Sequence, residues 1–460
     1  MSTQYQPENE HTPDERSRTV PLLSLQQLAL FILAGIAALI AKGEYHQSQE
    51  VQAGTRIERI GVTAVQNFQF LEIEALLATQ AGQELQEIVK DGRPLEEYPA
   101  ASLEVALQTI LDNIHEQNQL KGHTNYVTSA SFSPDGKRIV TASWDKTARV
   151  WDITGKEIAS LKGHTQGVWS ASFSPDGKRI VTASADNTAR VWEITGKEIA
   201  SLKGHTQNVW SASFSPDGKR IVTASWDNTA RVWEITGKEI ASLKGHTNYV
   251  ISADFSPDGK RIVTASVDNT ARVWEITGKE IALLKGHTDV LTSASFSWDG
   301  KRIVTASADN TARVWEITGK EIALLKGHTN AVRSASFSLD GKRIVTASLD
   351  NTARVWEITG KGIALLKGHT DAIIRASFSR DGKRIVTASV DNTARVWEIT
   401  GKEIALLKGH TDVVTSASFS WDGKRIVTAS ADNTARVWQI DDLDVSLSRG
   451  CRCLNDYFAK

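Results

Sequence analysis

Cysteine is nearly absent from this sequence, which holds only Cys451 and Cys453, both close to its C-terminal end. One intervening residue leaves the two too close for an easy disulfide with each other. No third or fourth ligand lies nearby in the sequence to complete a metal site. We therefore expect neither a disulfide-stabilised fold nor a cysteine metal site, and we interpret residues 449–460 as a reduced, cytosolic C-terminal tail.

A strong charge of one sign is also missing, because 53 Lys and Arg residues nearly balance 54 Asp and Glu residues. The balance conceals an asymmetry, since residues 1–119 hold 17 acidic and 7 basic side chains, a net charge of −10, and the remainder is close to +9. The basic excess is spread along the chain, so we expect no nucleic-acid surface. The overall composition is that of a soluble globular protein.

Long hydrophobic runs are scarce, and the one present is of borderline length. Residues 28–41 are all apolar, and the stretch lengthens to residues 20–41 if three polar residues are tolerated. A membrane-spanning helix needs about 20 predominantly apolar residues. Residues 20–41 are therefore predicted to form a hydrophobic helix and a candidate membrane anchor, with a signal peptide or a buried, partner-binding helix as alternatives. Residues 1–19 are polar and acidic, which predicts a disordered tail.

Residues 42–119 are predicted to form a helical linker. Apolar residues recur at roughly helical spacing between residues 47 and 90, and the sequence Asp91-Gly-Arg-Pro94 interrupts that pattern. Ser102 can cap a second helix that ends near Glu116.

A 41-residue repeat organises the rest of the chain. The pair Gly-His recurs eight times, from His123 to His410, and a tryptophan follows each at the same offset. In the first repeat, β-prone stretches at residues 127–132, 138–143, 147–151 and 158–161 are separated by turns rich in Asp, Gly and Pro. Four such strands make a small sheet with two apolar faces, and packing copies around an axis buries both. Residues 120–448 are therefore predicted to form an all-β propeller of eight four-stranded blades, preceded by the α-helical N-terminal segment.

Closure of the ring leaves two alternatives open. Eight near-identical repeats could pair out of register or close as seven blades with one left over. The last blade needs an outer strand from residues 117–120 or from residues 445–447, and higher β-propensity slightly favours the second stretch.

The repeat resembles the WD-repeat family over roughly residues 117–448, because an Asp follows each Gly-His by 22 residues and a Trp follows that Asp by six. The resemblance implies that a His, a Thr, the turn Asp and the Trp of each blade are joined by hydrogen bonds. For the first three blades this structural set includes His123, Thr141, Asp145 and Trp151, then His164, Asp186 and Trp192, then His205, Asp227 and Trp233. The preceding stretch is similar to linkers of cyanobacterial-type signalling proteins, which implies the bacterial scaffold or sensor half of such a protein without its NTPase.

The repeated His and Asp residues do not indicate catalysis. Repetition places them once per blade, far from one another, whereas an active site needs different residues at one point. The Thr-Gly-Lys turns lack the first glycine and the hydroxyl residue of a phosphate-binding loop. We expect no enzyme, no metal and no cofactor; the alternative is a small-ligand receptor or an enzyme that uses the central channel.

Positions that differ between otherwise near-identical repeats predict where the propeller binds. Three such positions lie in loops and strand ends at the face where propellers of the resembled family usually receive partners. They provide Tyr126, Trp144, Trp169, Trp210, Trp226 and Tyr249 in blades one to four, to which blades six and seven add Arg333 and Arg375. Trp, Tyr and Arg dominate the binding energy of protein interfaces.

We therefore predict a monomeric propeller that binds other proteins on this face. Its role would be that of a scaffold, and of a signalling sensor or adaptor if residues 20–41 attach it to a membrane; otherwise the protein would be cytoplasmic. The alternative for the aromatic residues is that some only pack between adjacent loops. Trp298 and Trp421 replace the proline of a Ser-Pro-Asp-Gly turn and are expected on the opposite face, as a second contact.

Overall fold

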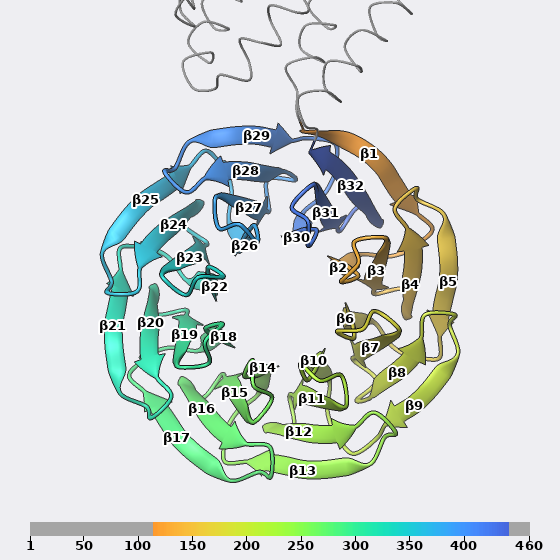
Figure 1. Cartoon of the computed structure of the whole chain (residues 1–460), viewed down its shortest axis with the longest axis horizontal. Coiled ribbons are helices and arrows are strands. Elements are labelled where there is room, and N and C mark those ends of the chain that lie inside the picture. Colours follow the sequence, from red (N-terminus) through yellow and green to blue (C-terminus); the bar gives the residue numbers. More distant parts are fainter. Residues whose placement is uncertain (1–113, 441–460) are drawn as a thin grey trace, which may run out of the picture. The chain divides into compact units, whose positions relative to one another are not determined.

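The computed structural model describes residues 114–440, which form eight four-stranded antiparallel sheets. Figure 1 shows these sheets as blades around a central axis, with the first strand of each blade innermost. The first strand of blade one contacts the first strand of blade eight, so the ring closes with eight blades and none is left over. The predicted disordered tail 1–19, hydrophobic helix 20–41, linker residues 42–113 and C-terminal tail 449–460 lie outside the described residues.

The strands of successive blades have nearly the same length and the same offset along the chain. Blade one holds β2 (Val127–Phe132), β3 (Arg138–Ser143), β4 (Thr147–Asp152) and β5 (Glu157–Lys162); blade two holds β6 (Val168–Phe173), β7 (Arg179–Ser184), β8 (Ala189–Glu193) and β9 (Glu198–Leu202). Blade three holds β10 (Val209–Phe214), β11 (Arg220–Ser225), β12 (Thr229–Glu234) and β13 (Glu239–Lys244); blade four holds β14 (Val250–Phe255), β15 (Arg261–Ser266), β16 (Thr270–Glu275) and β17 (Glu280–Lys285). Blade five holds β18 (Leu291–Phe296), β19 (Arg302–Ser307), β20 (Thr311–Glu316) and β21 (Glu321–Lys326); blade six holds β22 (Val332–Phe337), β23 (Arg343–Ser348), β24 (Thr352–Glu357) and β25 (Gly362–Lys367). Blade seven holds β26 (Ile373–Phe378), β27 (Arg384–Ser389), β28 (Ala394–Glu398) and β29 (Glu403–Leu407); blade eight holds β30 (Val414–Phe419), β31 (Arg425–Ser430), β32 (Thr434–Ile440) and β1 (Ile114–Lys121).

Tight turns explain why the strands stay short. In blade one, the amide of Gly136 donates a hydrogen bond to the carbonyl oxygen of Ser133 at 2.8 Å, and Gly136 has a φ of +66°. That left-handed conformation carries no steric penalty in glycine. The turn between the second and third strands also needs a positive φ, which asparagine tolerates in blades two to eight, whereas Lys146 adopts it in blade one.

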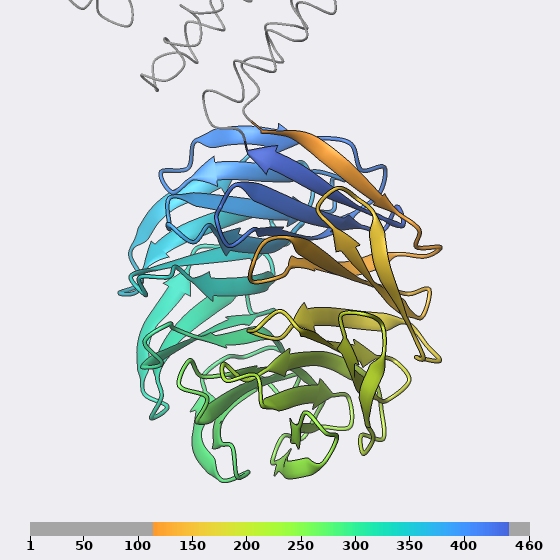
Figure 2. The same ribbon diagram turned by 45° about the vertical axis from the view of Figure 1, so that its right-hand side comes forward.

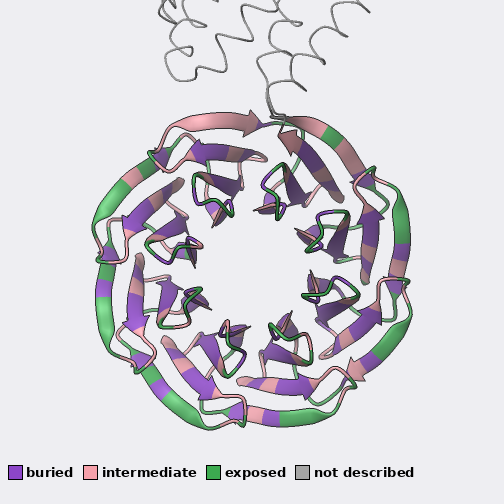
Figure 3. Ribbon diagram, viewed as in Figure 1, coloured by how far each residue is buried: buried purple, intermediate pink, exposed green. Residues whose placement is uncertain are grey.

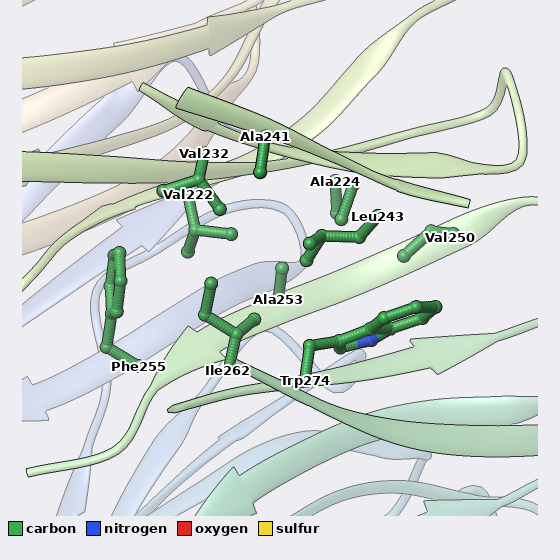
Figure 4. Close-up of a cluster of buried hydrophobic side chains, with 11 residues drawn as sticks. Val222, Ala224, Val232, Ala241, Leu243, Val250, Ala253, Phe255, Ile262 and Trp274 are labelled. Atoms are coloured by element: carbon green, nitrogen blue, oxygen red, sulfur yellow. The ribbon is translucent and has the colours of Figure 1, made fainter. Parts of the chain in front are cut away.

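The hydrophobic core lies between neighbouring blades. Figure 4 shows one of these clusters, in which Val222 and Leu243 of blade three face Ile262 and Trp274 of blade four. The second strand of each blade is buried almost throughout because its two faces pack against two neighbours, as in β3. The fourth strands form the outer rim, where most strands hold both buried and exposed residues, as in β5 (Figure 3). Each blade is therefore stabilised mainly by the blades beside it.

The N-terminal stretch supplies the closing strand, so the slight preference for residues 445–447 was wrong. β1 pairs antiparallel with β32, and Leu120 lies opposite Ala435. Leu120 is fully buried in a cluster with Trp151 of blade one, a gain that outweighs the weak β-propensity of the stretch. The strand begins at Ile114, so residues 114–116 are extended and do not continue the predicted helix to Glu116.

The ring has two faces, which we name by their loops. The His-loop face carries the loop before each first strand, such as residues 122–126, and the turn between second and third strands, such as residues 144–146. The hairpin face carries the other two turns of each blade, such as residues 133–136 and 153–156. Figure 2, turned by 45°, shows these loops projecting at both ends of the blades.

Candidate protein-interaction face

A four-residue hydrogen-bond chain ties the His-loop face to the body of each blade. In blade one, Nδ1 of His123 lies 2.7 Å from Oδ2 of Asp145, and its Nε2 lies 2.7 Å from Oγ1 of Thr141. The indole N–H of Trp151 donates to the same Thr141 oxygen at 2.9 Å. Because a carboxylate only accepts, the imidazole donates from Nδ1 to Asp145, which leaves Nε2 of the Nδ1–H tautomer to accept from the Thr141 hydroxyl. These hydrogen bonds thus connect the loop before the first strand, the turn between the second and third strands, and those two strands.

The turn aspartate is held in its ionised form. Burial alone would raise the pKa of Asp145, but hydrogen bonds from His123 and Thr147 outweigh burial and hold that pKa well below its ordinary value. In blade three the balance is the same for Asp227, whose donors are His205 and Thr229. Every donor of this network is used within its own blade, so the network serves the turn and offers nothing to a substrate.

The same bonds recur in the other blades at nearly the same distances. The bond from His164 to Asp186 measures 2.8 Å, and the bond from His205 to Asp227 measures 2.7 Å. The indoles of Trp192 and Trp233 donate to their threonines at 2.9 Å. All residues of the structural set inferred from the WD-repeat resemblance therefore take part in these chains.

Backbone pairing brings the variable positions together. The amide of Trp144 donates to the carbonyl oxygen of Tyr126 at 2.9 Å, and the amide of Trp226 donates to that of Asn208 at 3.0 Å. The turn between the second and third strands is thereby fixed beside the His loop of the same blade. Tyr126 and Trp144 are 53% and 38% exposed, so both present aromatic surface to solvent.

Aromatic side chains of blades one to four form one continuous row across four blades. We call it the aromatic row, and it consists of Trp144, Trp169, Trp210, Trp226 and Tyr249. The centroids of successive rings lie 4.8, 4.2, 5.6 and 5.2 Å apart. The first contact is edge-to-face and the last two are stacked, which are favourable geometries for aromatic pairs. The rings therefore pack against one another, as the alternative interpretation held, yet Trp144 and Tyr249 remain more than a third exposed.

Gly167 makes room for the start of the aromatic row. A Cβ atom on Gly167 would lie 2.8 Å from two ring carbons of Trp144, closer than real Cβ contacts come. Other blades carry side chains at this position, such as Tyr126 and Ala331. The absence of a side chain at Gly167 therefore leaves the space that the Trp144 ring of the preceding blade occupies.

Trp169 and Trp210 occupy a position that other blades use for stability. In blades one, five and eight a threonine stands there, and its hydroxyl donates to a first-strand carbonyl oxygen of the next blade at 2.6–2.8 Å. Neither Trp169 nor Trp210 makes such a bond within the described chain. The indole N–H of Trp169 is also buried without an acceptor among the described residues. Such a bond is worth about 1 kcal/mol, and blades two and three have contacts between aromatic rings in its place.

Arg333 and Arg375 lie on the innermost strands of blades six and seven. Arg333 is the second residue of β22, and Arg375 is the third residue of β26. Both side chains are exposed. Protein atoms packed around its guanidinium remove part of its hydration, and this desolvation, together with the charge of Arg333, lowers the pKa of Arg375, which remains a cation although the side chain is in part exposed.

The hairpin face carries the two remaining exposed tryptophans. Trp298 and Trp421 are 52% and 48% exposed, and they lie in turns between first and second strands, which places them on the face opposite the aromatic row. The guanidinium of Arg380 lies 3.6 Å from the ring centroid of Trp421. This cation–π contact joins blades seven and eight, and the sequence had not indicated it.

Asp254 of β14 is a titratable residue that the sequence analysis did not identify. The other seven blades carry serine at this position, and this single difference between the repeats could have identified it. Burial raises the pKa of Asp254 to about 6, against a backbone hydrogen bond from Phe255 that lowers it. Between residues 114 and 440, no group of His, Cys, Asp and Glu side chains is placed to hold a metal ion. The same residues contain no helix that could cross a membrane.

The fold and the hydrogen-bond chains define a class of protein, the closed eight-bladed propeller with one His–Thr–Asp–Trp set per blade. Eight segments match the family described as WD domain, G-beta repeat. They are residues 115–152, 155–193, 196–234, 237–275, 278–316, 319–357, 360–398 and 401–439. The chain therefore belongs to the WD40 repeat family.

Two relatives come from the cyanobacterium Synechocystis, and both are uncharacterized WD repeat-containing proteins. They are 35% identical over 139 residues and 46% identical over 128 residues, or 29% and 27% of this chain. The matched segments make up only 12% and 8% of the relatives' own lengths. The predicted similarity to cyanobacterial WD-repeat proteins is thus confirmed for the repeats.

Two solved structures share the fold. A computationally designed protein, Ika8, aligns over 71% of this chain and 99% of its own, with a TM-score of 0.64 and 32% sequence identity. The C-terminal WD40 domain of Sif2 aligns over 72% of this chain and 99% of its own, with a TM-score of 0.63 and 22% identity. The second likeness is one of fold alone.

Proposed function

We propose that this protein is a non-catalytic interaction scaffold, and that a partner protein binds to the His-loop face of blades one to four. The observation that carries the proposal is the aromatic row, in which rings from four blades touch in sequence at positions where near-identical repeats differ. Tryptophan and tyrosine bury large areas at small cost in side-chain entropy, which makes them frequent centres of protein interfaces.

The absence of an inter-blade hydrogen bond, among the described residues, at two positions of the aromatic row supports a role in binding. Trp169 and Trp210 replace a threonine whose hydroxyl bonds to the next blade in three other blades, and the Trp169 indole N–H has no acceptor between residues 114 and 440. Residues that break a local rule repeated elsewhere in the same fold commonly serve function. The repeats themselves supply replacements that already occur at the same position in other blades, such as Thr128.

Capture of partners by matched variants of the full chain tests the proposal. The test variant carries Trp169→Thr and Trp210→Thr, which restores the residue of blade one. The control carries Trp298→Pro and Trp421→Pro, which restores the hairpin turn of blades one to four. Quantitative mass spectrometry should find partners that the wild-type chain and the control retain and the test variant loses at least tenfold. Equal capture by all three chains would contradict the assignment of the face.

Membrane attachment is the second part of the proposal, and it rests on the sequence of residues 20–41 alone. A scaffold attached in this way would act as a sensor or adaptor in signalling. Alkaline extraction of membranes from the native host tests it. Retention of the full chain in the membrane pellet is expected, and release into the soluble fraction would assign residues 20–41 to packing or docking instead.

A further inference from the structure

Arg375 stands where the other seven blades carry serine. At four junctions between blades this serine accepts a hydrogen bond from a first-strand amide of the next blade. These bonds join Ala130 to Ser416, Ala171 to Ser129, Ala335 to Ser293 and Ala376 to Ser334, at 3.2–3.4 Å. An arginine has no acceptor to offer, so the corresponding amide of Ala417 in blade eight loses this partner. Blade seven thus forgoes an inter-blade bond in order to place a guanidinium near the axis.

Arg333 makes a similar exchange in blade six. The equivalent position in blades one, five and eight holds a threonine, whose hydroxyl donates a hydrogen bond to the next blade. Two adjacent blades therefore each replace a stabilising hydroxyl with a cation. No hydrogen bond or ion pair joins either guanidinium to another residue of the described chain, although most other arginines of the blades have an acidic partner.

The two cations repel one another. β22 and β26 are the neighbouring first strands of blades six and seven, and the charge of Arg333 contributes to the lowered pKa of Arg375. Two unpaired like charges in a partly desolvated place are unfavourable for the folded protein. An anion placed between them would remove that repulsion. Guanidinium groups match carboxylate and phosphate oxygens with two parallel hydrogen bonds each, which sets the chemistry of such an anion.

The symmetry of the ring relates this pair to the aromatic row. Arg333 of blade six occupies the same position as Trp169 of blade two, four blades away in a ring of eight and so directly across the axis. Blade seven, with Arg375, lies in the same way across from blade three, with Trp210. An extended peptide across the centre of the His-loop face would meet aromatic rings at one end and two cations at the other.

We infer that Arg333 and Arg375 form an anion subsite that binds a carboxylate or phosphate group of a partner peptide, whose apolar residues lie on the aromatic row. The inference rests on the proposed function for the identity of the partner, but the subsite itself can be tested without one.

Thermal unfolding of the full chain in sodium phosphate and in sodium acetate, each against sodium chloride at equal ionic strength and pH 7, tests the subsite. The test variant carries Arg333→Thr and Arg375→Ser, the residues of blades five and six at these positions. The control variant carries Lys178→Ser and Lys219→Ser, which removes two exposed cations from the hairpin face. The wild type and the control should gain melting temperature with anion concentration, and the test variant should need at least tenfold more anion for the same gain.

A second readout separates binding from structure. In chloride alone the test variant should melt about 2 °C above the wild type, because it regains two inter-blade bonds and loses the repulsion. Two results would overturn the subsite: no response of the wild type to either anion, or an equal response of the wild type and the test variant. A stronger response to phosphate would assign a phosphorylated partner, and a stronger response to acetate an acidic side chain.

The proposed function fails independently of this subsite. If Trp169→Thr and Trp210→Thr leave partner capture unchanged while the anion response is intact, the assignment of the aromatic face alone is refuted. An intact effect of those substitutions with no anion response would refute the subsite alone. Tighter binding of a single-stranded oligonucleotide than of an acidic peptide of equal charge would overturn the assignment of the anion to a peptide.

Discussion

Removing the turn aspartate of one blade should destabilise that blade. The substitution is Asp227→Ala, because the Asp227 side chain is only 6% exposed and accepts four hydrogen bonds. The donors are Nδ1 of His205 at 2.7 Å, the amide of Thr206 at 3.1 Å, and the amide and hydroxyl of Thr229 at 3.0 and 2.6 Å. Alanine leaves all four without this acceptor.

The expected loss follows from the burial of these donors. A buried donor without an acceptor costs about 1–3 kcal/mol, but water can reach the exposed amide of Thr206. We therefore expect the free energy of unfolding to fall by about 3 kcal/mol, and the melting temperature of a ring this size by about 5 °C. Because neighbouring blades stabilise one another, amide hydrogen exchange should increase first in blade three.

The pH dependence of the loss has a definite sign. The folded protein holds the pKa of Asp227 well below its ordinary value, so the ionised carboxylate stabilises the fold above the pKa of the unfolded chain. That contribution begins to decline as the pH falls below about 4 and is lost fully only at a much lower pH, so the free-energy difference between wild type and Asp227→Ala should shrink progressively there. The control is Asp289→Ala, an exposed aspartate whose carboxylate accepts one hydrogen bond within the described chain, from the amide of Val290. An unchanged melting curve for Asp227→Ala, or a loss no larger than that of the control, would refute the reasoning.

Three further predictions concern particular residues. Asp254→Ser should be as stable as the wild type below pH 4 and more stable than the wild type, by at most about 3 kcal/mol, as the pH rises past 6. The reason is that folding raises the pKa of Asp254 from 3.8 to about 6, so ionisation of this carboxyl destabilises the folded wild type. Denaturant unfolding of both proteins across this pH range measures the difference. Gly167→Ala should displace Trp144 and weaken partner binding, which a shift in tryptophan fluorescence emission would report; an unchanged spectrum would count against the close contact. Leu120→Ala should cost about 3 kcal/mol, as much as Leu161→Ala in blade one, and a silent substitution would mean that another strand closes the ring.

The repeat itself made the fold predictable. Gly-His and Trp recur at a fixed offset, and the four strands of blade one lie within one residue of the stretches expected from their β-prone residues and turns. The prediction of the closing strand was wrong because it compared the β-propensities of the two candidate stretches and not their positions in the repeat. Glu116 and Leu120 precede His123 by the same offsets at which Glu157 and Leu161 precede the next repeat's His. That alignment would have identified β1, because the side chains of Glu116 and Arg436 pair as those of Glu157 and Arg149 do.

The candidate site was predictable only in part. Variation among the repeats located the aromatic side chains, because positions that escape the repeat are free to serve function. It did not reveal that five rings touch in order, since contact between blades depends on the geometry of the ring. Nor did it assign purposes to Gly167 or Asp254, whose roles depend on the packing of a neighbouring blade and on burial.

A footprint of the bound partner on the full chain tests the central claim most directly. Amide hydrogen exchange of the full chain would be measured with and without a partner that the wild type and the control variant capture and the tryptophan variant does not. We predict protection of the loops and strand ends on the His-loop face of blades one to four, including the amides around Trp169 and Trp210, with the hairpin face unchanged. Protection confined to the turns around Trp298 and Trp421 would contradict the account.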